Sequence, residues 1–236
     1  MKKRIFLVTL LMLTVLASLP AYSQSHTETR DSSKIEQFII HYRVNDIELD
    51  ADYMDKVYRR YLGLPWEILE TERCYIRETV PEDADEFFGI YSAPGMTLYN
   101  DGLAPELEQE RQYIRDYIDK VYRFYNFGVW TILKKDTHEI IGRAGFSFRE
   151  GFEGPELGYV IGRSWQGQGY ATEVCRAILQ YGFRELGFDE VHAFVRPENE
   201  SSMRLCRKLG MSCGEIQGDV CEAGCEEMWE ESCKET

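Results

Sequence analysis

The chain has 236 residues, of which 44% are hydrophobic and 13% aromatic, so it can bury a sizeable core and wholesale disorder is disfavoured. Its formal net charge of −14 argues against general nucleic-acid binding, which needs a basic surface. Residues 215–236 hold eight acidic side chains and one lysine, so about half of the acidity belongs to the C-terminal end.

The N-terminus has the layout of a secretory signal peptide. The basic residues Lys2–Arg4 precede an apolar run, Ile5–Ala17, which is too short to span a membrane comfortably. Small residues then occupy positions −3 and −1 of a cleavage site before Gln24. The alternative is a buried strand at Arg4–Thr9 of a cytoplasmic protein. We expect residues 1–23 to be signal-like, with membrane contact only if they stay uncleaved.

Residues 24–70 are predicted to form a linker and a small α/β appendage. The stretch 24–34 is polar and lacks periodicity. An apolar run over Glu36–Val44 favours a strand. Tyrosines and a valine at helical spacing predict a helix over Ala51–Leu62, which Gly63 ends.

The main domain is expected over residues 71–217, with elements in the order β-α-α-β-β-β-α-β-α-β. The predicted strands are Arg73–Thr79, Gly128–Lys134, Glu139–Arg149, Glu156–Gly162, Glu190–Arg196 and Met211–Gln217. The predicted helices are Pro81–Tyr91, Glu106–Tyr125, Tyr170–Leu186 and Glu198–Leu209. The short turn between the second and third strands predicts an antiparallel hairpin. Residues 218–236 are interpreted as an acidic, cysteine-containing tail.

Seven cysteines leave the cellular compartment open. Cys74, Cys175 and Cys206 lie in apolar patterns and are predicted to be buried thiols. The others crowd the C-terminal end at Cys213, Cys221, Cys225 and Cys233. Because this end has no paired C-x-x-C and no nearby histidine, we expect no metal there. Disulfides stay open if the protein is exported.

The most informative segment runs from Glu156 to Thr172, where a strand leads into Gly167 and Gly169 and a helix follows at once. Glycines permit positive φ and close approach of a ligand, and the first N–H groups of the helix face outward. A pyrophosphate suits such a site, although a plain strand-to-helix turn has the same pattern. No Gly-Lys-Ser/Thr follows, which excludes a Walker loop. Thr172 replaces the third glycine of a dinucleotide fingerprint.

This turn resembles the cofactor-binding motif of the GNAT superfamily of N-acetyltransferases. Gln166-Gly-Gln-Gly-Tyr-Ala171 matches the Q/R-x-x-G-x-G/A signature of that family. Asn199-Glu-Ser-Ser202 and Lys208-Leu-Gly-Met211 match a second family segment at the expected spacing. The resemblance covers residues 71–217 and implies an α+β fold: a mixed, mostly antiparallel sheet with a splayed parallel strand pair and flanking helices. Glu156-Leu-Gly-Tyr159, Trp165 and Asn199-x-x-Ser202 look most like the branch that includes the ribosomal-protein N-terminal acetyltransferases.

The resemblance implies acetyl-CoA as co-substrate and a primary amine as acceptor. The pyrophosphate would be held by backbone N–H groups of the turn, with help from Gln166. The turn residues concerned are Gly167, Gln168, Gly169, Tyr170 and Ala171.

In the family, the strand before this turn carries a bulge and parts from the next parallel strand, here Glu190–Arg196. Exposed backbone groups of Tyr159, Val160 and Ile161 would then pair with the pantetheine arm. One of their N–H groups would polarise the thioester carbonyl.

An amine with a pKa of about 10.4 must lose a proton before it attacks, so a base is needed. Glu156 is the candidate base, because family members often place a catalytic glutamate there; the alternative is a simple exposed carboxylate. Glu150 and Glu153 are weaker candidates. Asn199 would cap the helix over Glu200–Leu209, and in the family it also contacts CoA.

One position departs from the family pattern. Many relatives have a tyrosine seven residues after Asn199 that protonates the leaving thiolate, and here Cys206 stands there. A thiol with a pKa of about 8.5 is a weak candidate acid, and core packing is the favoured interpretation. Tyr159, Tyr170 and water are the other candidates. A CoA-binding scaffold without catalysis is the alternative function.

The N-terminus and the chemistry point to different compartments. Acetyl-CoA use favours the cytoplasm, whereas the signal-like segment favours export or a membrane tether. No motif identifies the acceptor, because its groove would be built by the helices over 81–125 and by loops. A small amine, an antibiotic and a protein N-terminus are all compatible acceptors. Whether the protein forms a homodimer is a separate open question.

Overall fold

The computed structural model describes residues 51–217 and 220–226. The chain divides into two compact units, Met1–Asp55 and Lys56–Thr236. Of the first unit only the start of helix α3 (Ala51–Tyr61) is described, and this helix matches the one predicted there. The signal-like segment 1–23, the polar linker and the strand predicted over Glu36–Val44 lie outside the described residues. Among the helices that are described, none has both the length and the apolar character needed to span a membrane.

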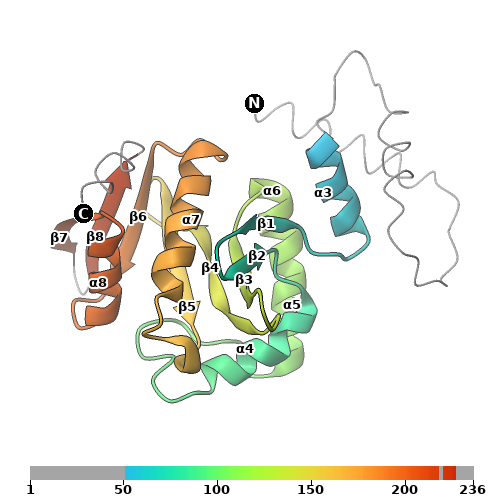
Figure 1. Cartoon of the computed structure of the whole chain (residues 1–236), viewed down its shortest axis with the longest axis horizontal. Coiled ribbons are helices and arrows are strands. Elements are labelled where there is room, and N and C mark those ends of the chain that lie inside the picture. The colour runs from blue at the N-terminus through green and yellow to red at the C-terminus, as the bar shows by residue number, and fades with distance from the viewer. Residues whose placement is uncertain (1–50, 218–219, 227–236) are drawn as a thin grey trace, which may run out of the picture. The chain divides into compact units, whose positions relative to one another are not determined.

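An eight-stranded sheet forms the centre of the second unit, in the order β1-β2-β3-β4-β5-β6-β8-β7 (Figure 1). Its strands are β1 (Glu67–Glu70), β2 (Cys74–Arg77), β3 (Val129–Lys134), β4 (Ile140–Phe148), β5 (Pro155–Ile161), β6 (Glu190–Val195), β7 (Ser212–Gln217) and β8 (Val220–Glu226). All neighbours are antiparallel except β5 and β6, which are parallel. The mixed, mostly antiparallel α+β sheet expected from the sequence is confirmed.

Two strands of this sheet were not predicted. β1 pairs with β2, so the sheet begins upstream of the expected start at residue 71. β8 lies between β6 and β7, so its residues belong to the sheet and not to the expected tail. Cys221, Ala223 and Cys225 are buried, as every second residue of a strand with one covered face should be.

The helical segments follow the predicted order. They are η1 (Pro81–Asp83), α4 (Ala84–Tyr91), α5 (Leu107–Tyr117), η2 (Ile118–Tyr122), α6 (Arg123–Tyr125), η3 (Arg163–Trp165), α7 (Tyr170–Arg184) and α8 (Glu200–Lys208). The helix predicted over Glu106–Tyr125 is a single run, α5–η2–α6, whose middle segment is a π-helix. Asn126 ends it in the left-handed conformation, with φ 64°.

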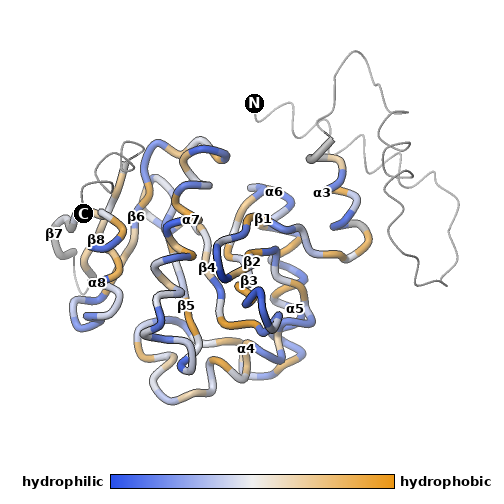
Figure 2. Tube along the Cα trace, in the orientation of Figure 1, coloured by the Kyte–Doolittle hydropathy of each residue, from blue (hydrophilic) through white to orange (hydrophobic). Residues whose placement is uncertain are grey.

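The two faces of the sheet are covered by different helices. Side chains of β4 show this, because those at odd spacing point to opposite faces. Phe146 packs under α7, where a Cβ added at Gly182 would lie 2.6 Å from its ring. Arg143, three residues earlier, lies on the other face and donates a hydrogen bond from Nε to the hydroxyl of Tyr91 in α4, at 2.8 Å. Figure 2 shows apolar and hydrophilic stretches alternating along α5 and α7. Fully buried core residues include Trp130, Val174, Ile178 and Leu179.

The three cysteines predicted to be buried thiols are buried and form no disulfide. They are Cys74, Cys175 and Cys206. Burial raises the pKa of the Cys74 thiol to about 11, so it stays protonated at neutral pH.

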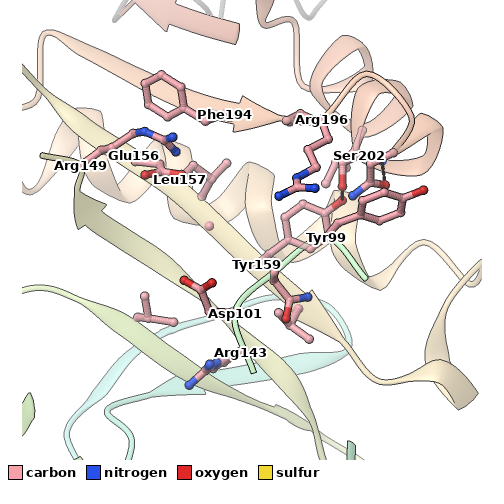
Figure 3. Close-up of a pocket in the computed structure, with 18 of the residues that line it drawn as sticks. Tyr99, Asp101, Arg143, Arg149, Glu156, Leu157, Tyr159, Phe194, Arg196 and Ser202 are labelled. Atoms are coloured by element: carbon pink, nitrogen blue, oxygen red, sulfur yellow. Dashed lines mark hydrogen bonds between the residues drawn. The ribbon is translucent and has the colours of Figure 1, made fainter. Parts of the chain in front are cut away.

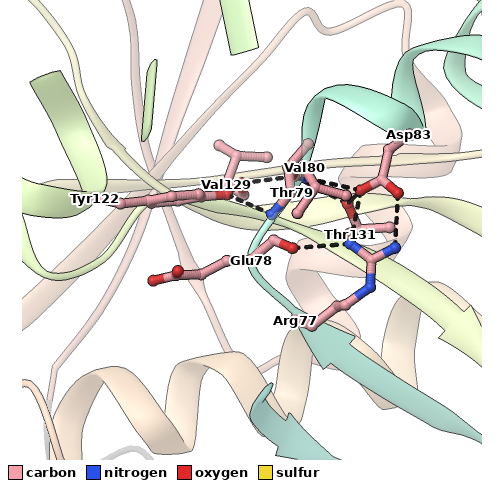
Figure 4. Close-up of polar contacts among 8 residues, drawn as sticks. All are labelled: Arg77, Glu78, Thr79, Val80, Asp83, Tyr122, Val129 and Thr131. Atoms are coloured by element: carbon pink, nitrogen blue, oxygen red, sulfur yellow. Dashed lines mark hydrogen bonds and ion pairs between the residues drawn. The ribbon is translucent and has the colours of Figure 1, made fainter. Parts of the chain in front are cut away.

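A buried polar cluster ties the end of β2 to η1 and β3 (Figure 4). Arg77 donates to both carboxylate oxygens of Asp83, at 2.6 and 2.7 Å. The Thr131 hydroxyl and the Val80 N–H donate to Oδ2 of the same carboxylate, at 2.8 and 3.1 Å. The hydroxyls of Thr79 and Thr131 lie 2.9 Å apart. Because both oxygens of this buried carboxylate have donors, the cluster fixes the chain where β2 ends.

Candidate functional site

Strands β5 and β6 are joined at one end and parted beyond it. Their registered pair is Glu156↔His192, near the start of both strands. By contrast, β4 and β5 pair without interruption from Phe148↔Pro155 to Gly142↔Ile161. The bulge expected in β5 is therefore absent from this ladder. The splayed parallel pair is as expected.

A cavity of about 570 Å³ lies at this gap (Figure 3). From β5 it is lined by Glu156 and by the residues that follow as far as Val160, and from β6 by Ala193 to Val195. Tyr91, Tyr113 and Tyr117 line it from α4 and α5, and Tyr99 to Asp101 line it from the connecting loop. The helices expected to border the acceptor groove thus face the parted strands.

A second cavity, of about 470 Å³, adjoins the first at the turn after β5. The two share Tyr159, Val160, Asn199 and Ser202 in their linings. From the turn the second cavity is lined by Gln166, Gly167, Gly169, Tyr170, Ala171 and Thr172. Ile161 lines it as well, whereas Gln168 is missing from both linings. The sequence motif and the parted strands therefore form one continuous concave surface.

The N-terminus of α7 opens onto the second cavity. Gly167 and Gly169 have φ values of 74° and 86°, the left-handed region that suits glycine. No described side chain caps the helix, and the first helical hydrogen bond runs from the Glu173 N–H to the Gly169 carbonyl at 3.1 Å. The N–H groups of Tyr170 to Thr172 thus have no partner within the helix. With the helix dipole behind them, these groups can hold an anion.

The two glutamine side chains shape the turn from within. Nε2 of Gln166 donates to the Ile161 carbonyl at 2.8 Å, and Nε2 of Gln168 donates to the Ser164 carbonyl at 2.8 Å. Both amide nitrogens thus donate to backbone carbonyls of the protein itself. The bond made by Gln166 ties the turn to the end of β5.

Arg73 and Glu173 form an ion pair that contacts the outer side of the turn. Sequence analysis did not identify this pair. Nε of Arg73 donates to Oε2 of Glu173 at 2.6 Å, and its Nη1 donates to the Gln168 carbonyl at 3.1 Å. The guanidinium lies 4.2 Å from the ring centroid of Tyr170. The Thr71 hydroxyl donates to Oε1 of Glu173 at 2.6 Å. Because these partners are about a hundred residues apart in sequence, no local pattern could show the contact.

Glu156 lies at the point where β5 meets β6 and lines the larger cavity. Burial raises the pKa of its carboxyl group above the usual range, and the positive charge of Arg149 partly opposes this. A carboxylate with a raised pKa is a stronger base, which suits proton transfer near neutral pH. The weaker candidates Glu150 and Glu153 are exposed and line neither cavity.

The remaining candidates lie on the α8 side of the gap. Asn199 caps α8, with Oδ1 accepting from the Ser202 N–H at 3.2 Å. The hydroxyls of Tyr159 and Ser202 lie 2.9 Å apart, and burial raises the pKa of Tyr159. Cys206 is 3% exposed, yet it lines the larger cavity. Tyr170 is 7% exposed and packs in the core.

Over residues 51–217 and 220–226, no group of three or more His, Cys, Asp or Glu side chains is placed to hold a metal ion.

Comparison with known proteins gives matches over the same region. The sequence profile of the acetyltransferase (GNAT) domain matches residues 73–212. An uncharacterized N-acetyltransferase of Bacillus licheniformis, p20, is 34% identical over 146 residues, or 61% of this chain and 81% of that protein. The [ribosomal protein uS5]-alanine N-acetyltransferase of Escherichia coli is 39% identical over 77 residues, or 32% of this chain and 40% of that enzyme.

Solved structures show the same fold. The acetyltransferase from Agrobacterium tumefaciens superposes with a TM-score of 0.57 at 22% identity. The superposition covers 67% of this chain and 93% of the other. At this identity the likeness speaks for the fold alone.

Proposed function

Since the chain belongs to the GNAT acetyltransferase family and is an acyltransferase, we propose that it transfers an acetyl group from acetyl-CoA to a primary amine by direct attack. The observation that carries this proposal is the gap between β5 and β6 beside the uncapped N-terminus of α7. A diphosphate and an extended arm need these two features next to each other.

The residues around the gap fit acetyl-CoA. The N–H groups of Tyr170 to Thr172 suit its pyrophosphate, because they face a cavity at the positive end of a helix dipole. The edge of β5 at Tyr159 to Ile161 offers backbone groups to the pantetheine arm, since β6 has diverged there. When bound, acetyl-CoA supplies the acetyl group as a reactive thioester.

Glu156 is proposed to take the proton from the acceptor ammonium. Its place where the strands part puts it beside the end of the gap, and its raised pKa increases its basicity. A backbone N–H of β5 would stabilise charge that develops on the carbonyl oxygen. For the proton that the departing thiolate needs, the cavity offers the Tyr159 hydroxyl and the Cys206 thiol.

The test uses the full-length protein. CoA and acetyl-CoA binding are measured by calorimetry, and CoA release from acetyl-CoA is followed with a panel of primary amines. Binding together with amine-dependent CoA release is the expected result. Binding without turnover on any amine would favour the CoA-binding scaffold instead. Absence of binding would overturn the proposal.

A further inference from the structure

The larger cavity is lined by more basic than acidic side chains, although the whole chain carries a net charge of −14. Its charged lining consists of Arg143, Arg149 and Arg196 against Asp101 and Glu156. Figure 3 shows Arg149 and Glu156 close together and Arg143 well apart from them. A basic lining of this kind disfavours an acceptor whose only charges are ammonium groups.

Arg143 is held in place by aromatic rings and not by a carboxylate. Its Nε donates to the Tyr91 hydroxyl at 2.8 Å, and its guanidinium lies 5.0 Å from the Tyr91 ring centroid and 5.5 Å from that of Phe87. Among the described residues no carboxylate lies within ion-pair distance of it, Asp101 included. A guanidinium fixed in this way keeps its terminal N–H donors for a carboxylate or phosphate, which it can bind in a bidentate manner.

The sheet surface between Arg143 and Glu156 is open at Gly158. The registered pairs Arg143↔Val160, Gly145↔Gly158 and Ser147↔Glu156 place these residues on one face of the sheet. A Cβ added at Gly158 would meet no atom within 4 Å, so the space above it is open. Glu156 and Val160 are four residues apart, or about 13 Å along the strand. A small molecule of several bonds can therefore lie between the base and the guanidinium.

We infer that the acceptor amine carries an anionic group several bonds away, a carboxylate or a phosphate, which Arg143 binds while the amine meets Glu156. The inference rests on the proposed acetyl transfer and narrows its substrate class. Diamines and neutral amines are then poor acceptors, because they leave the Arg143 guanidinium without a counter-charge in a partly desolvated cavity.

The probes are matched amines. γ-Aminobutyrate and ε-aminocaproate are compared with their neutral amides and with putrescine, and ethanolamine phosphate is compared with ethanolamine. The full-length enzyme should use the better anionic amine about tenfold more efficiently, in kcat/KM, than its neutral partner. Whichever anion gives this preference identifies the group. Calorimetry with the same amines in the presence of CoA gives an independent readout of binding.

Arg143→Gln should bring the preference for the anionic amine close to one, and Arg143→Lys should keep part of it. KM for acetyl-CoA should hold in both variants, because Arg143 does not line the cavity at the turn. Arg123→Gln is the control, since Arg123 lies on α6 and pairs with Asp119 at 2.8 Å. Its preference should equal that of the parent protein.

The outcomes separate the two proposals. If no amine is acetylated, the acetyl transfer itself is wrong. If amines are acetylated but diamines or neutral amides serve equally well, only the anionic acceptor is overturned. A preference that survives Arg143→Gln but disappears in Arg149→Gln would overturn the assignment to Arg143.

Discussion

Glu156 and His192 face each other as registered partners where β5 and β6 run together, and over the rest of their described lengths the two strands share no further pair. The carboxylate proposed as the base therefore lies at the closed end of the gap between β5 and β6, which would admit the thioester. On its other side β6 is held by a continuous antiparallel ladder with β8, in which His192 is registered with Gly224. The strand that carries the partner of Glu156 is therefore fixed from the side that faces away from the gap.

Glu156→Gln should lower kcat about a hundredfold or more, the usual loss when a general base is removed. Because burial raises the pKa of Glu156, the acid limb of the parent protein's kcat/KM profile should lie above pH 4.5. Activity falls as the pH drops through that limb, since a protonated carboxyl cannot accept a proton. The pH profile of both proteins is the measurement. An unchanged acid limb in the variant would rule out Glu156 as the base.

The raised pKa of Glu156 also predicts how stability depends on pH, and this dependence runs opposite to that of the activity. The folded state binds this proton more tightly than the unfolded state, so the stabilising contribution is complete below pH 4.5 and is lost as pH rises through the folded pKa. At neutral pH the charged carboxylate of Glu156 therefore destabilises the folded state. The Tm of Glu156→Gln should equal or exceed that of the parent protein. Thermal unfolding across the pH range tests this. A clear drop in Tm at neutral pH would contradict it.

Gly158→Ala should impair use of the acceptor without harming the fold. Gly158 does not have positive φ, and a Cβ there would stand in open space on the cavity floor, so the change brings no strain. We expect kcat/KM for the amine to fall severalfold, and further for Gly158→Val, while the midpoint of unfolding holds or rises. Gly89→Ala is the matched control, because Gly89 in α4 also has open space and lacks positive φ. Equal kinetics in the two alanine variants would show that the floor is not used.

The turn could be predicted because its signal is local, whereas the parting of β5 and β6 was expected only from the family resemblance. Gly167 and Gly169 precede a helix with an apolar face, and the apolar strand before them ends at Ile161. The position of β8 was missed because the eight acidic side chains over residues 215–236 suggested a solvated tail. The small apolar residues Cys221, Ala223 and Cys225 occupy every second position of this segment, and this alternation indicates a strand.

The cavity and its supports could not be predicted from local patterns. Arg143 is an ordinary strand residue in the sequence, and its place over Tyr91 depends on how α4 packs on the sheet. The contact between Arg73 and Glu173 joins residues a hundred positions apart. Such pairings become visible only when the strand order is known, because that order decides which segments meet.

Arg73→Gln should raise KM for acetyl-CoA about two- to fivefold and leave kcat nearly unchanged, since a partly exposed ion pair contributes roughly 1 kcal/mol or less. The side chain positions the turn through Glu173 and the Gln168 carbonyl, and it does not line either cavity. The double variant Arg73→Gln/Glu173→Gln should raise KM for acetyl-CoA little more than either single variant, because each single change already breaks the same ion pair. Lys120→Gln, which breaks a 2.7 Å ion pair with Asp116 between exposed side chains that line neither cavity, is the control. A fall in kcat with an unchanged KM would contradict a positioning role.

Asp83→Ala should lower the free energy of unfolding by about 3 kcal/mol, because it leaves a largely buried cation without its counter-charge. The carboxylate is 4% exposed and receives both terminal nitrogens of Arg77, while the Thr131 hydroxyl would lose its acceptor as well. Asp85, two positions after Asp83, forms a more exposed ion pair with Arg111. Asp85→Ala should lower the free energy of unfolding by about 1 kcal/mol at most. Urea unfolding of the three proteins gives the comparison. Similar losses in the two variants would mean that the buried cluster contributes no more than a surface pair. A large loss for Asp83→Ala alone would show that the cluster holds the end of β2, and with it Thr79 in the wall of the larger cavity.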